Sequence, residues 1–148
     1  MIVLWHGAEP VGICVFAAPA ASLTLRTKHF GLANPRTAVA LAALNSHLWL
    51  LSRVVLHPTY RGAGIAAAFV RRACELCPVD WIETLSAMGR SNPFFERAGF
   101  TRVGVVRHAP GGSLRGAYGR ASKGSTTHRH AEPAYFVFDN RRRRLASE

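Results

Sequence analysis

Short apolar runs alternate along the chain with turn residues and with segments of helical pattern. Ile2–His6 and Val11–Ala17 lie on either side of residues 7–10, which include Gly and Pro, and this pattern predicts a β-hairpin. Leu48–Leu56 is almost continuously apolar, which is typical of a strand covered on both faces. Later strands are predicted at Trp81–Leu85, Thr101–Arg107 and Pro133–Asp139.

Helical patterns occupy several of the intervening segments. Pro35–His47 is rich in Ala and Leu and follows Asn34, and an Asn cap with Pro in the first helical position is a common helix start. A longer helix is predicted from Gly62 to Leu76, and its buried side is expected to consist of Ile65, Phe69, Ala73 and Leu76. Pro93–Ala98 predicts a short helix, whereas residues 18–34 are expected to be irregular, with Ser22–Arg26 as a candidate strand extension.

The stretch after the long apolar run carries the strongest sign of a binding site. A Pro-marked turn follows Leu56, and a glycine-rich loop then leads into a helix. The loop consists of Arg61, Gly62, Ala63, Gly64, Ile65 and Ala66. A helix N-terminus offers unpaired backbone N–H groups and a positive dipole end, glycine allows close approach of the backbone, and Arg61 adds a positive charge. This combination predicts a pyrophosphate-binding loop.

The loop fits neither the P-loop nor the dinucleotide-binding pattern. Its letters match Arg/Gln-x-x-Gly-x-Gly/Ala and resemble the acyl-CoA loop of the GNAT (Gcn5-related N-acetyltransferase) superfamily. Further along, Asn92-Pro93-Phe94-Phe95-Glu96-Arg97-Ala98-Gly99-Phe100 resembles the second landmark of that family, an aromatic pair followed by a short helix that ends in Gly-Phe. Within the superfamily, the chain is most similar to GNAT-like domains associated with bacterial ABC-type ATPases, as the run Leu51-Ser52-Arg53-Val54-Val55 indicates.

The resemblance implies a mixed α/β (α+β) fold. Its sheet is expected to be twisted, mostly antiparallel and built from about six strands, with a splayed central strand and flanking helices. The usual first strand and first two helices of the family are expected to be lacking. We expect a single domain over residues 1–140, which includes a long basic loop at 109–131, and a basic tail at 141–148.

The same resemblance implies an N-acyltransferase that moves an acetyl group from acetyl-CoA to an amine acceptor by direct attack, without a metal. In the family the pantetheine arm lies along the splayed strand, which here implies contacts with Val54, Val55 and Leu56. Phe95 stands where the family commonly has a proton-donating Tyr, and Met88 where it often has Asn. A phenyl ring cannot protonate a thiolate, so Phe95 is expected to pack against the pantetheine, and the activity itself stays open.

Acetyl transfer also needs a neutral amine, because an amine with a Lys-like pKa is mostly protonated near pH 7. The central strand carries no carboxylate. Glu83 on the next predicted strand and Ser52 on the central strand are the nearest candidates for catalysis, with water as the alternative carrier of the proton. Both residues also have a structural interpretation. His57, directly before Pro58, is interpreted as a turn residue.

The net charge of +11 is concentrated in the last third of the chain. Residues 101–148 hold ten Lys or Arg and three Asp or Glu. Such a surface attracts polyanions, so an alternative function is a GNAT-fold protein that binds or modifies nucleic acid. A solvated basic tail explains the charge equally well. A third alternative is a catalytically inactive GNAT-like partner of an ATPase.

The cysteines are Cys14, Cys74 and Cys77. Their spacing does not suggest a disulfide framework, which favours a reducing compartment. Cys74 and Cys77 resemble half of a metal site, with His128 and His130 as further candidates, but a second closely spaced pair is lacking. We therefore expect structural cysteines and no metal. No apolar run reaches transmembrane length, so we expect a cytoplasmic protein without membrane contact, and a homodimer is compatible with the family.

Overall fold

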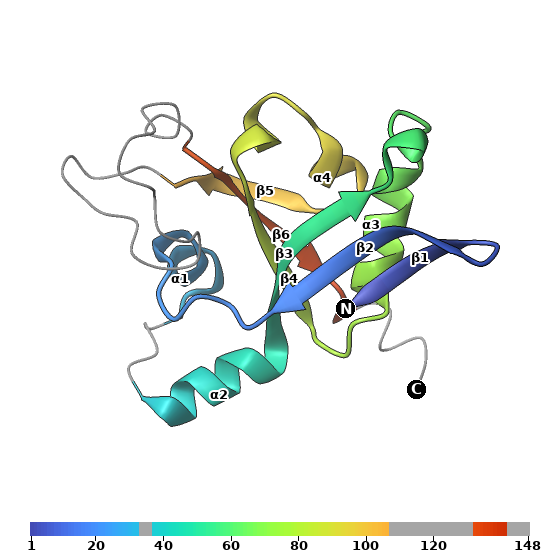
Figure 1. Ribbon diagram of the computed structural model, residues 1–148. Helices are drawn as coiled ribbons and strands as arrows, with labels where there is room; N and C mark the ends of the chain where they lie inside the picture. The colour runs from blue at the N-terminus through green and yellow to red at the C-terminus, as the bar shows by residue number, and fades with distance from the viewer. Residues whose placement is uncertain (33–36, 107–131, 142–148) are drawn as a thin grey trace, which may run out of the picture.

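The computed structural model describes residues 1–32, 37–106 and 132–141 of the chain. Their strands form a six-stranded sheet in the order β1-β2-β3-β4-β6-β5 (Figure 1). Neighbouring strands are antiparallel except for β3 and β4, which run parallel. The strands are β1 Ile2–His6, β2 Glu9–Ala17, β3 Leu48–Leu56, β4 Trp81–Ser86, β5 Thr101–Val105 and β6 Ala134–Asp139. The mostly antiparallel sheet predicted from the sequence is confirmed.

The first three strands form an antiparallel meander that contains an irregularity in β3. β2 pairs with β3 from Gly12↔Leu56 to Ala17↔Leu50. The register shifts between Val15 and its neighbour Phe16, which leaves Ser52 as an extra residue on β3. A bulge of this kind changes the face that the following side chains present and increases the local twist. The end of β3 is therefore directed differently from its beginning.

β3 and β4 separate soon after they meet. Their register covers only Leu48↔Trp81 to Leu50↔Glu83. The next link is a side-chain bond, in which the Thr84 hydroxyl donates to the Leu51 carbonyl at 3.0 Å. β4 instead pairs along its whole length with β6. This divergence is the splayed central strand that the sequence predicted.

Helix α3, Ile65–Glu75, packs against one face of the sheet. Its buried residues are Phe69, Val70, Ala73 and Cys74, which join Cys14, Leu51 and other buried residues in the hydrophobic core. The predicted buried side is correct for Phe69 and Ala73 and wrong for Leu76, which is 54% exposed. Leu76 lies beyond the last helical residue, so the helical periodicity no longer determines where its side chain points.

Two further helices lie between β2 and β3 in the sequence: α1, Thr24–Phe30, and α2, Ala38–His47. The prediction of an irregular segment at 18–34, with Ser22–Arg26 as a candidate strand extension, is therefore wrong. α1 ends at Gly31, which adopts the left-handed conformation (φ 62°) and donates its N–H to the Thr27 carbonyl. Figure 1 shows α2 leading into the start of β3.

The predicted start of α2 at Asn34 and Pro35 lies outside the described residues. As described, α2 begins after Thr37, whose hydroxyl accepts a hydrogen bond from the Ala40 N–H at 3.2 Å. α4, Phe94–Arg97, and the short turns η1, Pro58–Tyr60, and η2, Ala87–Arg90, complete the helical elements of the described ranges. None of the helices in these ranges has both the length and the apolar character that crossing a bilayer requires.

Candidate active site

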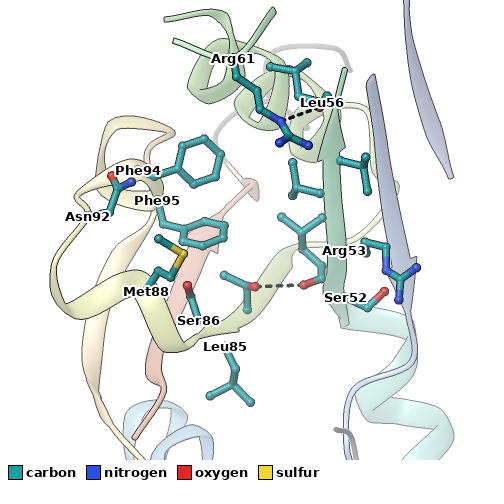
Figure 2. Close-up of a pocket in the computed structure, with 14 residues that line it drawn as sticks. Ser52, Arg53, Leu56, Arg61, Leu85, Ser86, Met88, Asn92, Phe94 and Phe95 are labelled. Atoms are coloured by element: carbon teal, nitrogen blue, oxygen red, sulfur yellow. Dashed lines mark hydrogen bonds between the residues drawn. The ribbon is translucent and has the colours of Figure 1, made fainter. Parts of the chain in front are cut away.

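A cleft of about 510 Å³ opens where β3 and β4 diverge. Figure 2 shows its two walls: β3 from Leu51 to Leu56 on one side, and the end of β4 with η2 and α4 on the other. Arg61 lies at one end of the β3 wall, and Ser52 and Arg53 lie at the other. The cleft therefore runs along the part of β3 that has lost its partner β4.

The backbone of this part of β3 points alternately to β2 and into the cleft. The His57 N–H donates to the Val11 carbonyl at 2.8 Å, so residues two apart in the antiparallel ladder, such as Val55, also bond to β2. Val54 and Leu56 consequently direct their N–H and C=O groups toward the divergence. The Leu56 carbonyl accepts a hydrogen bond from Arg61 Nε at 3.1 Å, which agrees with this direction.

The glycine-rich loop runs from Arg61, which lines one end of the cleft, to the N-terminus of α3. Gly62 and Gly64 have φ values of 84° and 77°, a conformation that other residues rarely adopt. A Cβ built on either glycine meets no atom within 4 Å, so the space above the loop is open. Gly64 caps α3 without a side-chain hydrogen bond, and the first turn holds no acidic residue. The first N–H groups of α3 are therefore positioned to receive an anion.

The wall opposite β3 is aromatic. Phe95 packs against Phe94, Phe100 and Phe136, with ring centroids 4.9 to 5.4 Å apart. Figure 2 shows the rings of Phe94 and Phe95 and the Met88 side chain directed toward β3. An apolar wall facing a strand with exposed backbone groups suits a ligand arm that carries both amides and methylene groups.

Glu83, one of the two catalytic candidates, is buried behind the cleft. Its side chain is 2% exposed, and Arg26 on α1 binds both carboxylate oxygens, at 2.9 and 2.8 Å. The Tyr135 hydroxyl donates to the same carboxylate at 2.8 Å. Burial, and then the negative charge of Glu83, raise the pKa of Tyr135. A carboxylate with this set of partners is positioned to hold α1 and β6 on β4, which favours a structural role.

Ser52, the second candidate, is exposed at the bulge and lines the cleft. Its hydroxyl donates to the Val15 carbonyl at 3.0 Å. This bond occupies a β2 carbonyl at the point where the extra residue interrupts the ladder. Ser52 is therefore placed at the site, and its hydroxyl oxygen, which donates in this bond, keeps the capacity to accept hydrogen bonds.

Comparison with known proteins identifies the family. The sequence profile described as the Acetyltransferase (GNAT) family matches residues 1–100. The chain belongs to this family. Among solved structures, a chimera of the spermidine N-acetyltransferase SpeG from Vibrio cholerae and hSSAT is similar, with a TM-score of 0.46, 12% identity and coverage of 66% of the chain. The match spans about half of that protein's own length, at 54%. A comparison with curated proteins found no significant match.

The predicted GNAT site residues lie in and next to one cleft. Its lining includes Val54, Val55, Leu56, Arg61 and Phe95. Residues 62–66 do not line it, but they follow Arg61 directly and lead into α3. Glu83 contributes no lining atom, whereas its neighbour on the strand, Thr84, does.

The cysteines of this GNAT chain are suited to packing. Burial raises the pKa of Cys14 to about 12 and that of Cys77 to about 11, and it raises the pKa of Cys74 as well. The thiols therefore stay protonated near neutral pH, and a thiol is a weak nucleophile and metal ligand compared with a thiolate. Within the described ranges, no three His, Cys, Asp or Glu side chains come together as a metal site would require. His128 and His130 lie outside these ranges.

The sequence did not single out several residues that shape the site. Arg26 and Tyr135 hold Glu83 from positions 57 and 52 residues away, and no local pattern reports such a pairing. Ser86 lines the cleft but belongs to no motif that predicts it, whereas Asn92 lines the cleft and begins the predicted landmark. Arg53 could have been found from the sequence, because a charged residue near the end of an otherwise apolar strand is unusual and marks a candidate site residue.

Proposed function

We propose that the protein transfers an acetyl group from acetyl-CoA to an amine by direct attack of the amine on the thioester. The observation that carries the proposal is the coincidence of two features at one cleft. One is the open, uncapped start of α3 behind Gly62 and Gly64, and the other is the set of β3 backbone groups that lack a partner on β4. Membership of the GNAT acetyltransferase family supports the same assignment.

The chain's own groups fit the parts of acetyl-CoA in order along the cleft. The N–H groups at the start of α3 would hold the pyrophosphate, and Arg61, already oriented by the Leu56 carbonyl, would add charge beside it. The backbone of Val54 and Leu56 would bind the amides of the pantetheine arm, which would pack against Phe95 on the other side. This leaves the thioester near the bulge, where the Val54 N–H would stabilise the oxyanion.

In the proposed reaction, the amine nitrogen forms a bond to the thioester carbon, and the carbon–sulfur bond then breaks. The products are the N-acetyl amine and CoA. The amine proton passes to water. Of the two candidate catalytic residues, Ser52 lines the cleft and its hydroxyl is the nearer proton acceptor. Glu83 has the structural role of holding β4 in place. Phe95 offers no proton to the departing thiolate, so the proton would come from water, and the transfer would be slower than with a Tyr at this position.

A pair of substitutions at Gly64 tests the donor site. Gly64→Glu would place a carboxylate at the predicted pyrophosphate position and is expected to weaken acetyl-CoA binding at least tenfold in calorimetric titration. Gly64→Ala is the matched control, since it imposes the same strain at φ 77° without the charge, and it should retain most of the affinity. Equal affinity in both variants, or unchanged affinity in Gly64→Glu, would contradict the proposal.

The charge distribution supports a second candidate, in which nucleic acid is the ligand or the acceptor. Ten Lys or Arg against three Asp or Glu in residues 101–148 favour binding to a polyanion. Deletion of residues 109–131 and 141–144 should then abolish duplex or RNA binding, and the binding of the intact chain should weaken steeply with salt. Unchanged binding by the truncated protein would exclude this candidate.

Association with an ATPase, a cytoplasmic location and a homodimer stay predictions. For a homodimer the sheet order matters, because β6 lies between β4 and β5 and is not an edge of the sheet. A second copy that added to the sheet would therefore pair with β5 or β1. The sedimentation of the purified chain would decide this point.

A further inference from the structure

Among the residues that the structure describes, the charged side chains that line the cleft are positive. Arg53 and Arg61 line it, and none of the Asp or Glu residues in the described ranges does. Glu83, which is adjacent in sequence to the lining residue Thr84, is buried and neutralised by Arg26. The remaining polar lining consists of hydroxyl and amide groups. An acceptor that approached this wall would therefore meet positive charge and no carboxylate.

The two arginines differ in what they already bind. Arg61 at one end of the cleft donates to the Leu56 carbonyl and adjoins the predicted pyrophosphate position. Arg53 is exposed at the other end, and within the described ranges its guanidinium forms no hydrogen bond or ion pair. Its cross-strand neighbour is Val15, and Val55 is the next residue on the same face of β3. No carboxylate on these strand positions competes for its charge.

Arg53 lies next to the end of the cleft where the acetyl group would be placed in the proposed function. Figure 2 shows Arg53 beside Ser52 at the bulge, at the opposite end of the cleft wall from Arg61, with its guanidinium extended on the β2 side, away from Phe94 and Phe95. If the pyrophosphate lies at the start of α3, the acetyl group reaches the cleft near this bulge. Arg53 is then the charged side chain next to the place where an acceptor would present its amine.

We propose that the acceptor is a small amine that also carries a carboxylate or phosphate group, and that Arg53 binds this anionic group. The inference rests on the proposed acetyltransferase function and names the class of its substrate. Arg53 would orient the acceptor through charge-assisted hydrogen bonds, which a guanidinium forms well with both kinds of anion. Its positive charge would also lower the pKa of a nearby ammonium group, which increases the neutral, reactive amine at a site without a carboxylate base. Polycationic amines would be poor acceptors for the same reason.

Four amines that share one aminoethyl framework test the inference: phosphoethanolamine, β-alanine, ethanolamine and ethylenediamine. Acetyl-CoA binding is measured first, and then kcat/KM for each amine at low and at high salt. The binding of each amine to CoA-saturated protein gives a second readout that does not depend on turnover. Arg53→Gln removes the charge, and Arg102→Gln is the matched control, because Arg102 is exposed on β5 at the far edge of the sheet and does not line the cleft.

We expect phosphoethanolamine or β-alanine to exceed ethanolamine and ethylenediamine about tenfold at low salt, with a smaller ratio at high salt. Arg53→Gln should lower that ratio about tenfold, whereas Arg102→Gln should keep it. The comparison of the first two amines identifies phosphate or carboxylate as the preferred anion. Equal or better use and binding of ethylenediamine would overturn the inference while leaving the acetyltransferase function intact. Failure to bind acetyl-CoA would overturn both.

Discussion

Arg26→Met removes the counter-ion of a buried carboxylate. The Arg26 and Glu83 side chains are 3% and 2% exposed, and the guanidinium makes two bonds to the carboxylate, at 2.9 and 2.8 Å. Met fills a similar length without charge, so the substitution leaves Glu83 buried with Tyr135 as its remaining partner. Breaking a buried pair from one side costs about 3–5 kcal/mol, out of a total stability of about 5–15 kcal/mol. We expect the midpoint of thermal unfolding to fall by roughly 10 °C.

Denaturant unfolding followed by tryptophan fluorescence measures this change. The double variant Arg26→Met/Glu83→Gln is the informative comparison, because Gln is neutral, has the same shape, and keeps an oxygen that can accept from Tyr135. It should recover at least about 1 kcal/mol relative to Arg26→Met, since the unpaired charge is gone. A loss below about 1 kcal/mol for Arg26→Met, or a double variant less stable than the single one, would refute the reasoning.

Three other predictions concern the core and the cleft. Gly89→Ala would bring a Cβ to 2.5 Å from the Phe136 ring and should cost about 1–3 kcal/mol in denaturant unfolding, and an unchanged midpoint would show that the ring moves freely. Burial raises the pKa of Cys14 and Cys77 above the ordinary 9.0 to about 12 and 11, so the unfolded thiols ionise first as the pH rises. Stability should therefore be nearly constant below about pH 8 and fall by about 1.4 kcal/mol per thiol by pH 10 in unfolding curves, whereas a flat profile would contradict the burial effect. Phe95→Tyr should raise kcat at least tenfold if proton donation to the thiolate limits the rate, and an unchanged kcat would place the limit elsewhere.

The conformation of the glycine-rich loop was predictable from the sequence because it is determined locally. The order of strand, loop and helix, together with glycines at 62 and 64, already specifies the conformation that the structure shows. Most strands and α3 were likewise predictable from apolar runs and helical periodicity. The splayed strand followed from the family resemblance, and the structure adds a bulge at Ser52, close to the point where β3 leaves β4.

The rest depended on contacts between distant segments. α1 was not predicted, because its segment has a mixed composition without a clear helical pattern. The helix carries Arg26, which is buried against Glu83, 57 residues away in the sequence. The environment of Glu83 was unpredictable for the same reason. The sequence of a strand looks the same whether a Glu in it is exposed or buried. Leu76 illustrates the limit of periodicity, which identifies the buried side of a helix but not the residue at which the helix ends.

The most direct test of the central claim is an amide NMR titration of the chain with acetyl-CoA. The account predicts saturable shifts that centre on the N–H groups of Gly64, Ile65 and Ala66 at the start of α3 and on Val54 and Leu56 along β3. Dephospho-CoA should shift the same amides, because the pyrophosphate and pantetheine are unchanged in it. An unshifted spectrum at millimolar acetyl-CoA, or shifts confined to β1 or β5, would contradict the assignment of this cleft as the acetyl-CoA site.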